Sequence, residues 1–403
     1  MKKLLTLVLS LIVALSCLGL TACGDKKGKD NAEEKDPEVG LICLHGESST
    51  YDKNFIDAFK KACANKGVAY KIIVDIPEGA ECKNAAIELI DEGCKVIFAD
   101  SFGHEPYMME VAERYSDVEF CHATGTQAKQ SSLPNYHNAF ASIYEGRYLA
   151  GYAAGLKLLT MTDKAVDNNF KVGYVGAFPY AEVKSGYTSW FLGVQAALEG
   201  TGYTATMDVT FTGSWYSETA EKTAAETLIT RGCVLISQHA DSMGAPTACE
   251  TAGIPNVAYN GSTGKSTMVA YSRINWVPYF EHMIDKYVNH TIADDYCGNL
   301  ENGAVEYFVE GPAAVAGTKE AIEAVKAELL AGTRRVFDCS KFTVDGEHLT
   351  SYAADIDGDY APDAGVNVIK TVNGITFFDE SNATEFRSAP YFDIDIDGIT
   401  LLN

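Results

Sequence analysis

Residues 205–244, ATMDVTFTGSWYSETAEKTAAETLITRGCVLISQHADSMG, decide the fold. Residues 206–212 alternate β-branched side chains with others, as a half-buried strand does, and this run ends at Gly213. Residues 217–230 have the apolar spacing of a helix, and a continuous apolar run follows at 233–236. This order predicts a β-α-β unit with two parallel strands.

The loops after these two strands form a candidate binding edge. A right-handed crossover joins parallel strands of one sheet, so both loops lie at the same carboxyl edge. The loops are GSWY at 213–216 and QHAD at 238–241. Open α/β sheets bind their ligands at this edge. The sequence therefore places Trp215, Tyr216 and Asp241 near a ligand.

An earlier stretch repeats the pattern. A strand is predicted at 70–74, a helix at 81–91 and a second strand at 96–99. The junction EGCKVIFADSFG at 92–103 also resembles RGCVLISQHADSMG at 231–244. Two such halves predict two α/β lobes whose carboxyl edges face each other across a cleft.

The lobes are predicted to exchange chain segments. With 403 residues, the chain is long enough for two domains of ordinary size. We expect the N-terminal lobe to cover 39–141, with 262–300 returning to it. The C-terminal lobe is expected to cover 142–261, with most of 301–403 returning to it. A helix at 144–159 is rich in glycine and alanine, which predicts close packing on another backbone.

The N-terminal end predicts export and a lipid anchor. Lys2 and Lys3 precede an apolar stretch at 4–20, which is typical of a signal peptide covering residues 1–22. The sequence Leu-Thr-Ala-Cys ending at Cys23 resembles a bacterial lipobox, which implies cleavage before Cys23 and a lipid on its sulfur. A transmembrane anchor is the weaker alternative, because the apolar stretch is near the lower length limit for spanning.

The composition limits the classes of binding partner and indicates the cellular location. Residues 24–38 lack apolar bulk and are predicted to be a flexible tether on the outer face of the cytoplasmic membrane. The net charge of −23 argues against nucleic acid and anionic membrane surfaces as partners. Of eleven cysteines, Cys17 and Cys23 fall in the N-terminal segment, which leaves nine without any C-x-x-C spacing. We expect buried thiols and, since export exposes thiols to oxidation, an oxygen-poor habitat.

No catalytic set is visible in the sequence. Histidines are scattered, and neither a G-x-S-x-G nor an H-E-x-x-H motif occurs. GSTGKS at 261–266 lacks the first glycine and the helix of a phosphate loop, so a turn between lobes is expected. DIDGD at 355–359 lacks the glycine position and terminal Glu of a calcium loop, so an acidic turn is expected. We therefore predict a protein that is not an enzyme and holds no cofactor or metal.

The carboxyl-edge loops combine aromatic rings with hydrogen-bonding groups. Flat rings suit a planar base, and a buried Asp without a cationic partner suits vicinal hydroxyls and disfavours a phosphorylated ligand. The candidate ligand-binding residues are Asp52, Asn54, Phe55, Ser101, Phe102, Phe178, Trp215, Tyr216, Asp241, Asn260 and Trp276.

The residues from 39 to about 342 resemble a known family, the basic membrane proteins, which are substrate-binding lipoproteins of ABC transporters and include purine nucleoside receptors. The resemblance is carried by DKNF at 52–55, IFADSFG at 97–103, DVEFCHATG at 117–125, IYEGRYLAGYAAG at 143–155, VGYVGAFPYAE at 172–182, TGSWY at 212–216 and QHADS at 238–242. It implies a type I periplasmic-binding-protein fold with two Rossmann-like lobes, a ligand in the cleft between them, and an ABC permease as partner of a monomer.

The resemblance also implies residue roles. Asp52 and Asn54 would hydrogen-bond a purine, Phe55 and Trp215 would stack on it, and Asp241 would hold ribose hydroxyls. HGESSTY at 45–51 departs from the glycine-rich sequence that often precedes the first motif in this family. The family often has a basic residue near the ligand, and Lys265 is the candidate for it here. Two alternatives stay open at this point: a receptor for a sugar or signalling molecule, and a nucleoside-hydrolysing enzyme.

Overall fold

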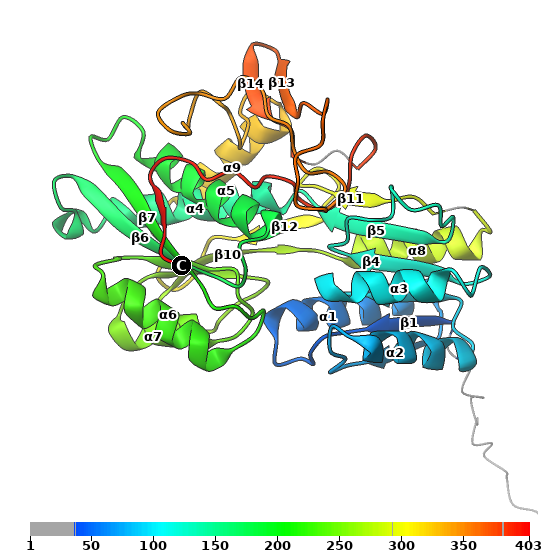
Figure 1. The fold of residues 1–403 in the computed structure, drawn as a ribbon. Coiled ribbons are helices and arrows are strands. Elements are labelled where there is room, and N and C mark those ends of the chain that lie inside the picture. Colours follow the sequence, from blue (N-terminus) through cyan, green and yellow to red (C-terminus); the bar gives the residue numbers. More distant parts are fainter. Residues whose placement is uncertain (1–35, 37, 292, 381–382) are drawn as a thin grey trace, which may run out of the picture. The chain divides into compact units, whose positions relative to one another are not determined.

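The computed structural model describes residues 36, 38–291, 293–380 and 383–403. The predicted signal peptide, Cys23 and nearly all of the predicted tether lie outside the described residues. The described chain forms two large sheets flanked by helices, as two α/β lobes, and a separate two-stranded sheet (Figure 1). This confirms the predicted fold class. None of the described helices combines the length and apolar character needed to cross a bilayer.

The first lobe is built on a parallel sheet with strand order β11-β5-β4-β3-β1-β2. Alternate strand residues face opposite layers, so Leu41 and Phe98 pack with α1 and α8, whereas Ile42 and Ile97 pack with α2 and α3. The strands are β1 (Val39–Ile42), β2 (Tyr70–Ile73), β3 (Val96–Ala99), β4 (Glu119–Ala123), β5 (Tyr136–Ala141) and β11 (Tyr296–Gly298), and the helices are α1 (Thr50–Lys66), α2 (Ala80–Asp91), η1 (Phe102–His104), α3 (Glu105–Ala112) and α8 (Val277–Val288).

The second lobe has the strand order β12-β10-β9-β8-β6-β7-β15, and only the β10–β12 pair is antiparallel among its described pairs. Helices α6 and α7 pack together on one face, and α4 and α5 pack together on the other. The strands are β6 (Asn169–Gly176), β7 (Thr204–Phe211), β8 (Ile236–Gln238), β9 (Asn256–Tyr259), β10 (Met268–Ile274), β12 (Val305–Phe308) and β15 (Ile399–Leu401), and the helices are α4 (Ile143–Leu158), η2 (Thr162–Lys164), α5 (Ala181–Leu198), α6 (Glu218–Thr230), α7 (Gly244–Ala252) and α9 (Thr318–Leu330).

The predicted β-α-β unit is β7-α6-β8, and its strands flank β6 in the sheet. The earlier unit, β2-α2-β3, has the same arrangement around β1. One boundary differs from the sequence prediction, because the second strand begins at Ile236 and the apolar run from 233 leads into it. Both units therefore direct their strand ends to one edge of each sheet, as the crossover rule requires.

The stretch 262–300, which the sequence analysis expected to return to the first lobe, divides between the two sheets. The stretch 268–274 is β10, which pairs with β9 in the second sheet. Only after β10 does the chain reach α8, which packs on α1, and β11, which pairs with β5. The chain therefore crosses to the first lobe after β10, because β10 pairs with β9 in the second sheet. The turn at 261–266, which the sequence suggested as the crossing point, precedes this crossing.

Helices α4 and α5 contact each other through their backbones, as the glycine-rich sequence predicted. A Cβ atom on Gly151 would lie 2.0 Å from the carbonyl oxygen of Trp190, and one on Gly193 would lie 2.1 Å from that of Tyr148. Glycine costs about 1 kcal/mol in a helix interior, and here the close contact of the two helices offsets this cost.

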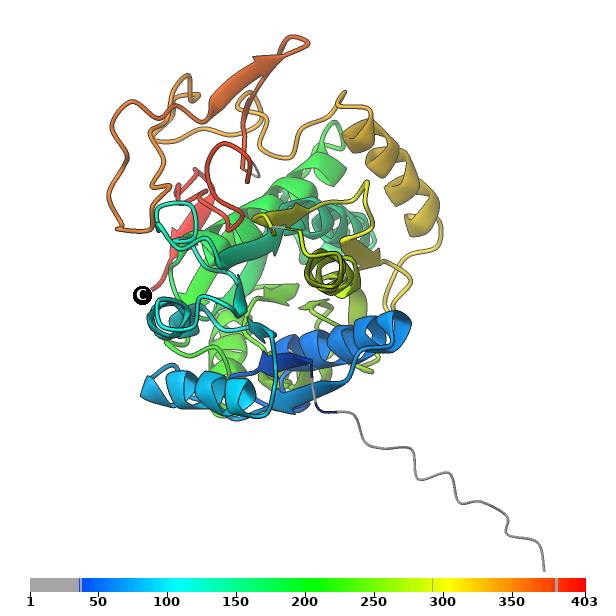
Figure 2. The same cartoon turned by 90° about the vertical axis from the view of Figure 1, so that its right-hand side faces the viewer.

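The C-terminal segment, residues 331–403, is part of the second lobe and also reaches the first. It adds β15 beside β7 and carries the hairpin of β13 (Ile369–Val372) and β14 (Ile375–Phe378), which stands out at the top of Figure 2. It contacts the first lobe where Lys129 Nζ donates to the carbonyl oxygen of Ala383 over 2.9 Å. The segment therefore contacts both lobes.

Eight cysteines are buried and carry free thiols: Cys43, Cys63, Cys82, Cys94, Cys121, Cys233, Cys249 and Cys339. This confirms the prediction of buried thiols for these positions. Burial raises the pKa of Cys82 to about 12, so its reactive thiolate form is scarce at neutral pH. The oxygen-poor habitat stays a prediction.

Phe392 should be essential to the stability of the C-terminal segment. Its ring is fully buried and stacks on Phe337 with centroids 4.3 Å apart. Phe392→Ala should lower the free energy of unfolding by about 3–5 kcal/mol, measured by urea unfolding, because it leaves a cavity. Leu330→Ala, at a side chain that is 49% exposed, should change it by less than about 1 kcal/mol. Equal effects of both changes would contradict the buried position of Phe392.

Glu380 should make the stability depend on pH. Its Oε1 atom accepts hydrogen bonds from the backbone N–H groups of Tyr391 and Phe392, and burial raises its pKa to about 8. An unfolded glutamate loses its proton near pH 4.3, so between these values the folded state holds the extra proton. The free energy of unfolding should therefore fall as pH rises through this window, by up to about 1.4 kcal/mol per pH unit.

Thermal unfolding between pH 6 and 9 tests this. Glu380→Gln removes the titrating group, so its melting temperature should fall less with pH than that of the wild type. Glu320→Gln, at an exposed position, serves as the matched control and should follow the wild type. Parallel curves for wild type and Glu380→Gln would show that Glu380 is ionised in the folded state.

Candidate ligand-binding cleft

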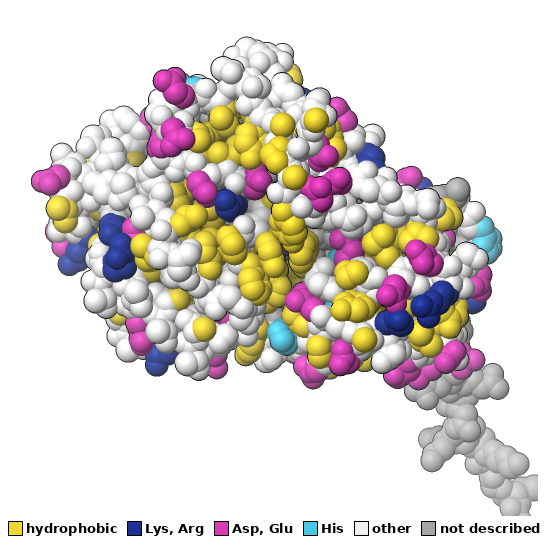
Figure 3. Space-filling view, in the orientation of Figure 1, with side chains coloured by type: hydrophobic (Ala, Val, Ile, Leu, Met, Phe, Trp, Pro, Cys, Tyr) yellow, Lys and Arg dark blue, Asp and Glu magenta, His cyan; other side chains and the backbone are white. Residues whose placement is uncertain are grey.

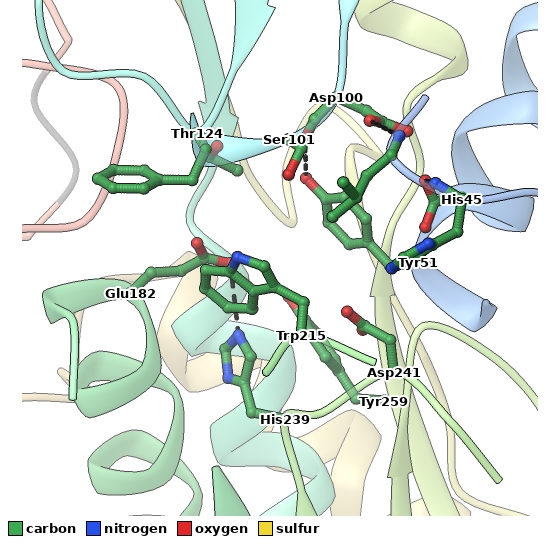
Figure 4. Close-up of a pocket in the computed structure, with 13 residues that line it drawn as sticks. His45, Tyr51, Asp100, Ser101, Thr124, Glu182, Trp215, His239, Asp241 and Tyr259 are labelled. Atoms are coloured by element: carbon green, nitrogen blue, oxygen red, sulfur yellow. Dashed lines mark hydrogen bonds and ion pairs between the residues drawn. The ribbon is translucent and has the colours of Figure 1, made fainter. Parts of the chain in front are cut away.

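A cavity lies between the carboxyl edges of the two sheets and contains about 390 Å³ of space free of atoms, part of it open to solvent. In Figure 3, apolar side chains gather along the line where the two lobes meet on that face. Figure 4 shows Tyr51, Asp100 and Ser101 on one side of the cavity and Trp215, Glu182 and Asp241 on the other. The lining residues are Leu44, His45, Tyr51, Asp52, Asp100, Ser101, Phe102, Thr124, Glu182, Trp215, His239, Asp241 and Tyr259.

The first lobe fixes its wall through the start of α1. Ser49 caps this helix, since its Oγ accepts the N–H of Asp52 over 3.2 Å. Asp52 Oδ1 accepts the N–H of His45 over 2.8 Å, and the Tyr51 hydroxyl donates to the carbonyl oxygen of Asp100 over 2.7 Å. These bonds hold a carboxylate and a phenol ring in place at the positive end of the helix, which favours the charge of Asp52.

The second lobe fixes its wall through the loops after β7 and β8. The N–H of Asp241 donates to the carbonyl oxygen of Trp215 over 3.0 Å, so the two loops hold each other. The Asn260 amide donates to Asp241 Oδ1 over 3.4 Å. The Phe178 ring lies edge-on against the Trp215 indole, with centroids 5.1 Å apart. Neighbouring residues thus position both the ring and the carboxyl group that face the cavity.

One contact joins the two walls directly. The backbone N–H and the hydroxyl of Thr50 both donate to the carbonyl oxygen of Asp241, each over 3.1 Å. Because these groups belong to different lobes, the contact ties the lobes together at one edge of the cavity.

The cavity is strongly acidic. Asp52, Asp100, Glu182 and Asp241 line it, and no Lys or Arg is among its lining residues. Burial and then the charge of Asp52 raise the pKa of Asp100 well above its usual value, and burial and then Asp52 do the same for Asp241. Anionic ligands are therefore disfavoured, and hydroxyl and amine donors are favoured because they satisfy the carboxyl oxygens.

Two groups of described residues bring three possible metal ligands within 4.8 Å of one another. Cys43, Asp52 and Asp100 form one of them, at the cavity wall. The other is Asp355, Asp357 and Asp363, in the predicted acidic turn. There Asp355 accepts the N–H groups of Gly358 and Tyr360, and Asp363 accepts that of Ile356, so these carboxylates serve to hold the turn.

Comparison with known protein families shows the family of this chain. The model of the Bmp family, described as PnrA-like ABC transporter substrate-binding proteins, matches residues 46–325. The chain belongs to this family. The match covers more than half of the chain and confirms the resemblance seen in the sequence.

Two curated relatives of this Bmp protein have different described ligands. A candidate ABC transporter glucose-binding protein of Haloferax volcanii is 28% identical over 273 residues, which are 66% of each chain. A purine-binding protein of Brucella abortus is 32% identical over 230 residues, which are 56% of this chain and 61% of the relative. The chain thus spans slightly less than two thirds of the length of these relatives.

A solved structure shares the fold of this Bmp protein. An ABC transporter solute-binding protein of Aeropyrum pernix superposes with a TM-score of 0.63 at 15% identity, covering 75% of this chain and 93% of that one. At this identity the likeness shows the fold, which is the type I periplasmic-binding-protein fold.

Five of the eleven predicted ligand-binding residues line the cavity: Asp52, Ser101, Phe102, Trp215 and Asp241. Three of the remaining predicted residues support the lining from behind or beside it. Phe178 and Asn260 contact Trp215 and Asp241 as described above, and the Tyr216 ring lies 5.4 Å from that of His45.

The other three predicted residues face elsewhere, which corrects the prediction. Asn54 follows Asp52 by two positions on α1 and therefore points away from it, so its amide donates to the carbonyl oxygen of Ile274 over 2.7 Å. Phe55 and Trp276 stack on each other in the core with centroids 4.3 Å apart. Lys265 does not line the cavity either.

Several lining residues were not among the predicted ligand contacts. Tyr51, Asp100, Thr124, His239 and Tyr259 lie in the first turn of α1 or at the ends of β3, β4, β8 and β9. Each of the last four ends or directly follows a parallel strand, so the carboxyl-edge rule applied to every strand would have found them. Glu182 in the first turn of α5 would follow from the same rule after β6.

Proposed function

We propose that this protein is the substrate-binding component of an ABC importer and that it carries a purine nucleoside or nucleobase in the cleft. The observation that carries the proposal is an acidic cavity that has aromatic rings in its walls and no lysine or arginine among its lining residues. The purine-binding relative supports the choice of ligand. The protein would bind and release its ligand without covalent chemistry.

The ligand contacts follow from the geometry of the walls. Trp215 from the second lobe offers a flat face for a base, with Tyr51 and Phe102 of the first lobe across the cavity. Asp241 and Glu182 accept hydroxyl donors, as a ribose offers. Asp52 and Asp100 take the polar edge of the base. This replaces the predicted Phe55–Trp215 sandwich, because Phe55 is in the core.

Closing of the lobes would report the bound ligand to the permease. The Thr50–Asp241 contact joins the lobes at one edge of the cavity, and the C-terminal segment also contacts Lys129 of the first lobe. A permease can recognise the closed pair of lobes and let them part, which releases the ligand.

The cellular location is also part of the proposal. A lipid on Cys23 would anchor a monomer to the outer face of the cytoplasmic membrane, and the sequence around Cys23 supports this. Mass spectrometry of the mature protein should find Cys23 as its first residue with a lipid attached, and Cys23→Ala should lose this lipid.

A sugar is the second candidate ligand, because a glucose-binding relative exists and carboxylates also bind sugar hydroxyls. A nucleoside hydrolase has less support, since the family consists of binding proteins. Calorimetry with guanosine, adenosine, adenine, glucose and a nucleoside monophosphate separates these cases. We expect binding of a nucleoside or base, weak or absent binding of the monophosphate, and no release of free base on long incubation.

Trp215→Ala and Asp241→Asn should weaken binding of the preferred nucleoside or base. Loss of one stacking face or one carboxyl acceptor costs about 1–3 kcal/mol, which is roughly a tenfold to hundredfold increase in Kd by calorimetry. Both variants should keep the circular dichroism spectrum and folded yield of the wild type.

Asp163→Asn is the matched control, because its side chain is 73% exposed and does not line the cavity. It should leave Kd unchanged. Unaltered affinity in both Trp215→Ala and Asp241→Asn would place the ligand outside this cavity.

A further inference from the structure

Arg147 on α4 is a fully buried cation directly behind the cleft wall. Its guanidinium carbon lies 4.1 Å from the centroid of the Tyr259 ring, and Tyr259 lines the cavity. Nη2 donates to the carbonyl oxygen of Gln238 over 3.0 Å and to the hydroxyl of Tyr174. Nε and Nη1 have no hydrogen-bond partner among the described residues. A buried charge with so few partners is costly, so a role for it is expected.

Arg147 also contacts His239, another lining residue. Nη2 of Arg147 lies 3.3 Å from Nδ1 of His239. The two N–H groups of Nη2 are directed at Gln238 and Tyr174, and a guanidinium nitrogen cannot accept a hydrogen bond. A proton on Nδ1 would therefore face a donor, which favours the tautomer with the ring proton on Nε2. Tyr174 Oη lies 3.4 Å from the same Nδ1 and can donate its own proton there, which favours the same tautomer.

The proton on Nε2 points to the ligand side of the wall. Nε2 of His239 lies 3.4 Å from Oε1 of Glu182, and Glu182 lines the cavity with 13% of its side chain exposed. The connection thus runs from Arg147 through His239 to Glu182 (Figure 4 shows its last step). A ring in the other tautomer would face Glu182 with a lone pair and would repel the carboxylate.

We infer that Arg147 is a positioning residue of the cleft, which fixes the His239 tautomer and thereby holds the Glu182 carboxylate as an acceptor for a hydroxyl or amine of the ligand. The ligand part of this inference rests on the proposed function, whereas the tautomer part does not.

The groups around His239 favour the neutral form of its imidazole ring. It is packed by Arg147 of α4, Tyr174 of β6, Glu182 of α5 and Tyr259 of β9. Burial lowers its pKa most, the charge of Arg147 lowers it further, and Glu182 opposes both. Without Arg147 the ring would take up a proton at higher pH, and Glu182 would be paired to a cation rather than left for the ligand.

Nitrogen NMR on the full mature protein with 15N-labelled histidine tests the tautomer. His239→Asn identifies the signals of His239 by their loss. In the wild type, Nδ1 should be unprotonated and Nε2 protonated, with little titration between pH 5.5 and 8. Arg147→Met, which fills the space without a donor, should show mixed tautomers and a higher titration midpoint, and Arg147→Lys should restore part of the wild-type pattern.

Affinity tests the ligand part. Arg147→Met and Glu182→Ala should each raise the Kd of the preferred nucleoside about tenfold, because each removes the oriented acceptor. The double variant should bind no worse than the weaker single variant, since both act on one group. If Arg147→Met fails to fold, Arg147→Lys is measured with the same readouts, and Tyr174→Phe supplies a milder loss of the second donor.

A folded Arg147→Met protein with the wild-type His239 tautomer and midpoint would overturn the inference and leave Arg147 a packing residue. Additive effects of Arg147→Met and Glu182→Ala would overturn the ligand part. If no nucleoside binds the wild type, the proposed function fails, while the tautomer measurement still decides the connection from Arg147 to Glu182.

Discussion

The parallel pairing of neighbouring strands is the constraint on which the cleft depends. Strands that run in the same direction all end at the same edge of the sheet, so the loops that follow them gather there. The chain does this in both lobes, around β1 in the first and around β6 in the second. Residues far apart in the sequence, such as Asp100, Thr124 and Asp241, therefore line one cavity. No local sequence preference could bring them together.

Electrostatics gives this cavity its selectivity. Removing carboxyl groups from water without cations costs free energy, and the raised pKa values of Asp100 and Asp241 reflect this cost. A ligand that donates hydrogen bonds repays part of it, whereas a phosphate adds to it. The positive charge of Arg147 is behind Tyr259 and His239 and acts through them. Arg147 is on α4, and the backbone contact between α4 and α5 holds α4 and therefore the Arg147 charge in place.

Much of the fold could be predicted from the sequence because hydrophobic periodicity and strand-end loops are local signals. They located β7, α6 and the edge that carries Trp215 and Asp241. The direction of a side chain was harder to predict. Phe55 and Trp276 follow the same rules as Trp215, yet they stack on each other in the core, because an aromatic ring fits a core as well as a cleft. The β10 pairing was missed since strand partners are long-range.

Native mass spectrometry of the protein as purified can detect a purine in the cleft, because a tight ligand remains bound through purification. We expect a mass increment equal to a purine nucleoside or base, which disappears when the protein is unfolded. An increment equal to a hexose would contradict the proposal that the cleft carries a purine. So would a protein without ligand that gains no mass after incubation with purine nucleosides and bases.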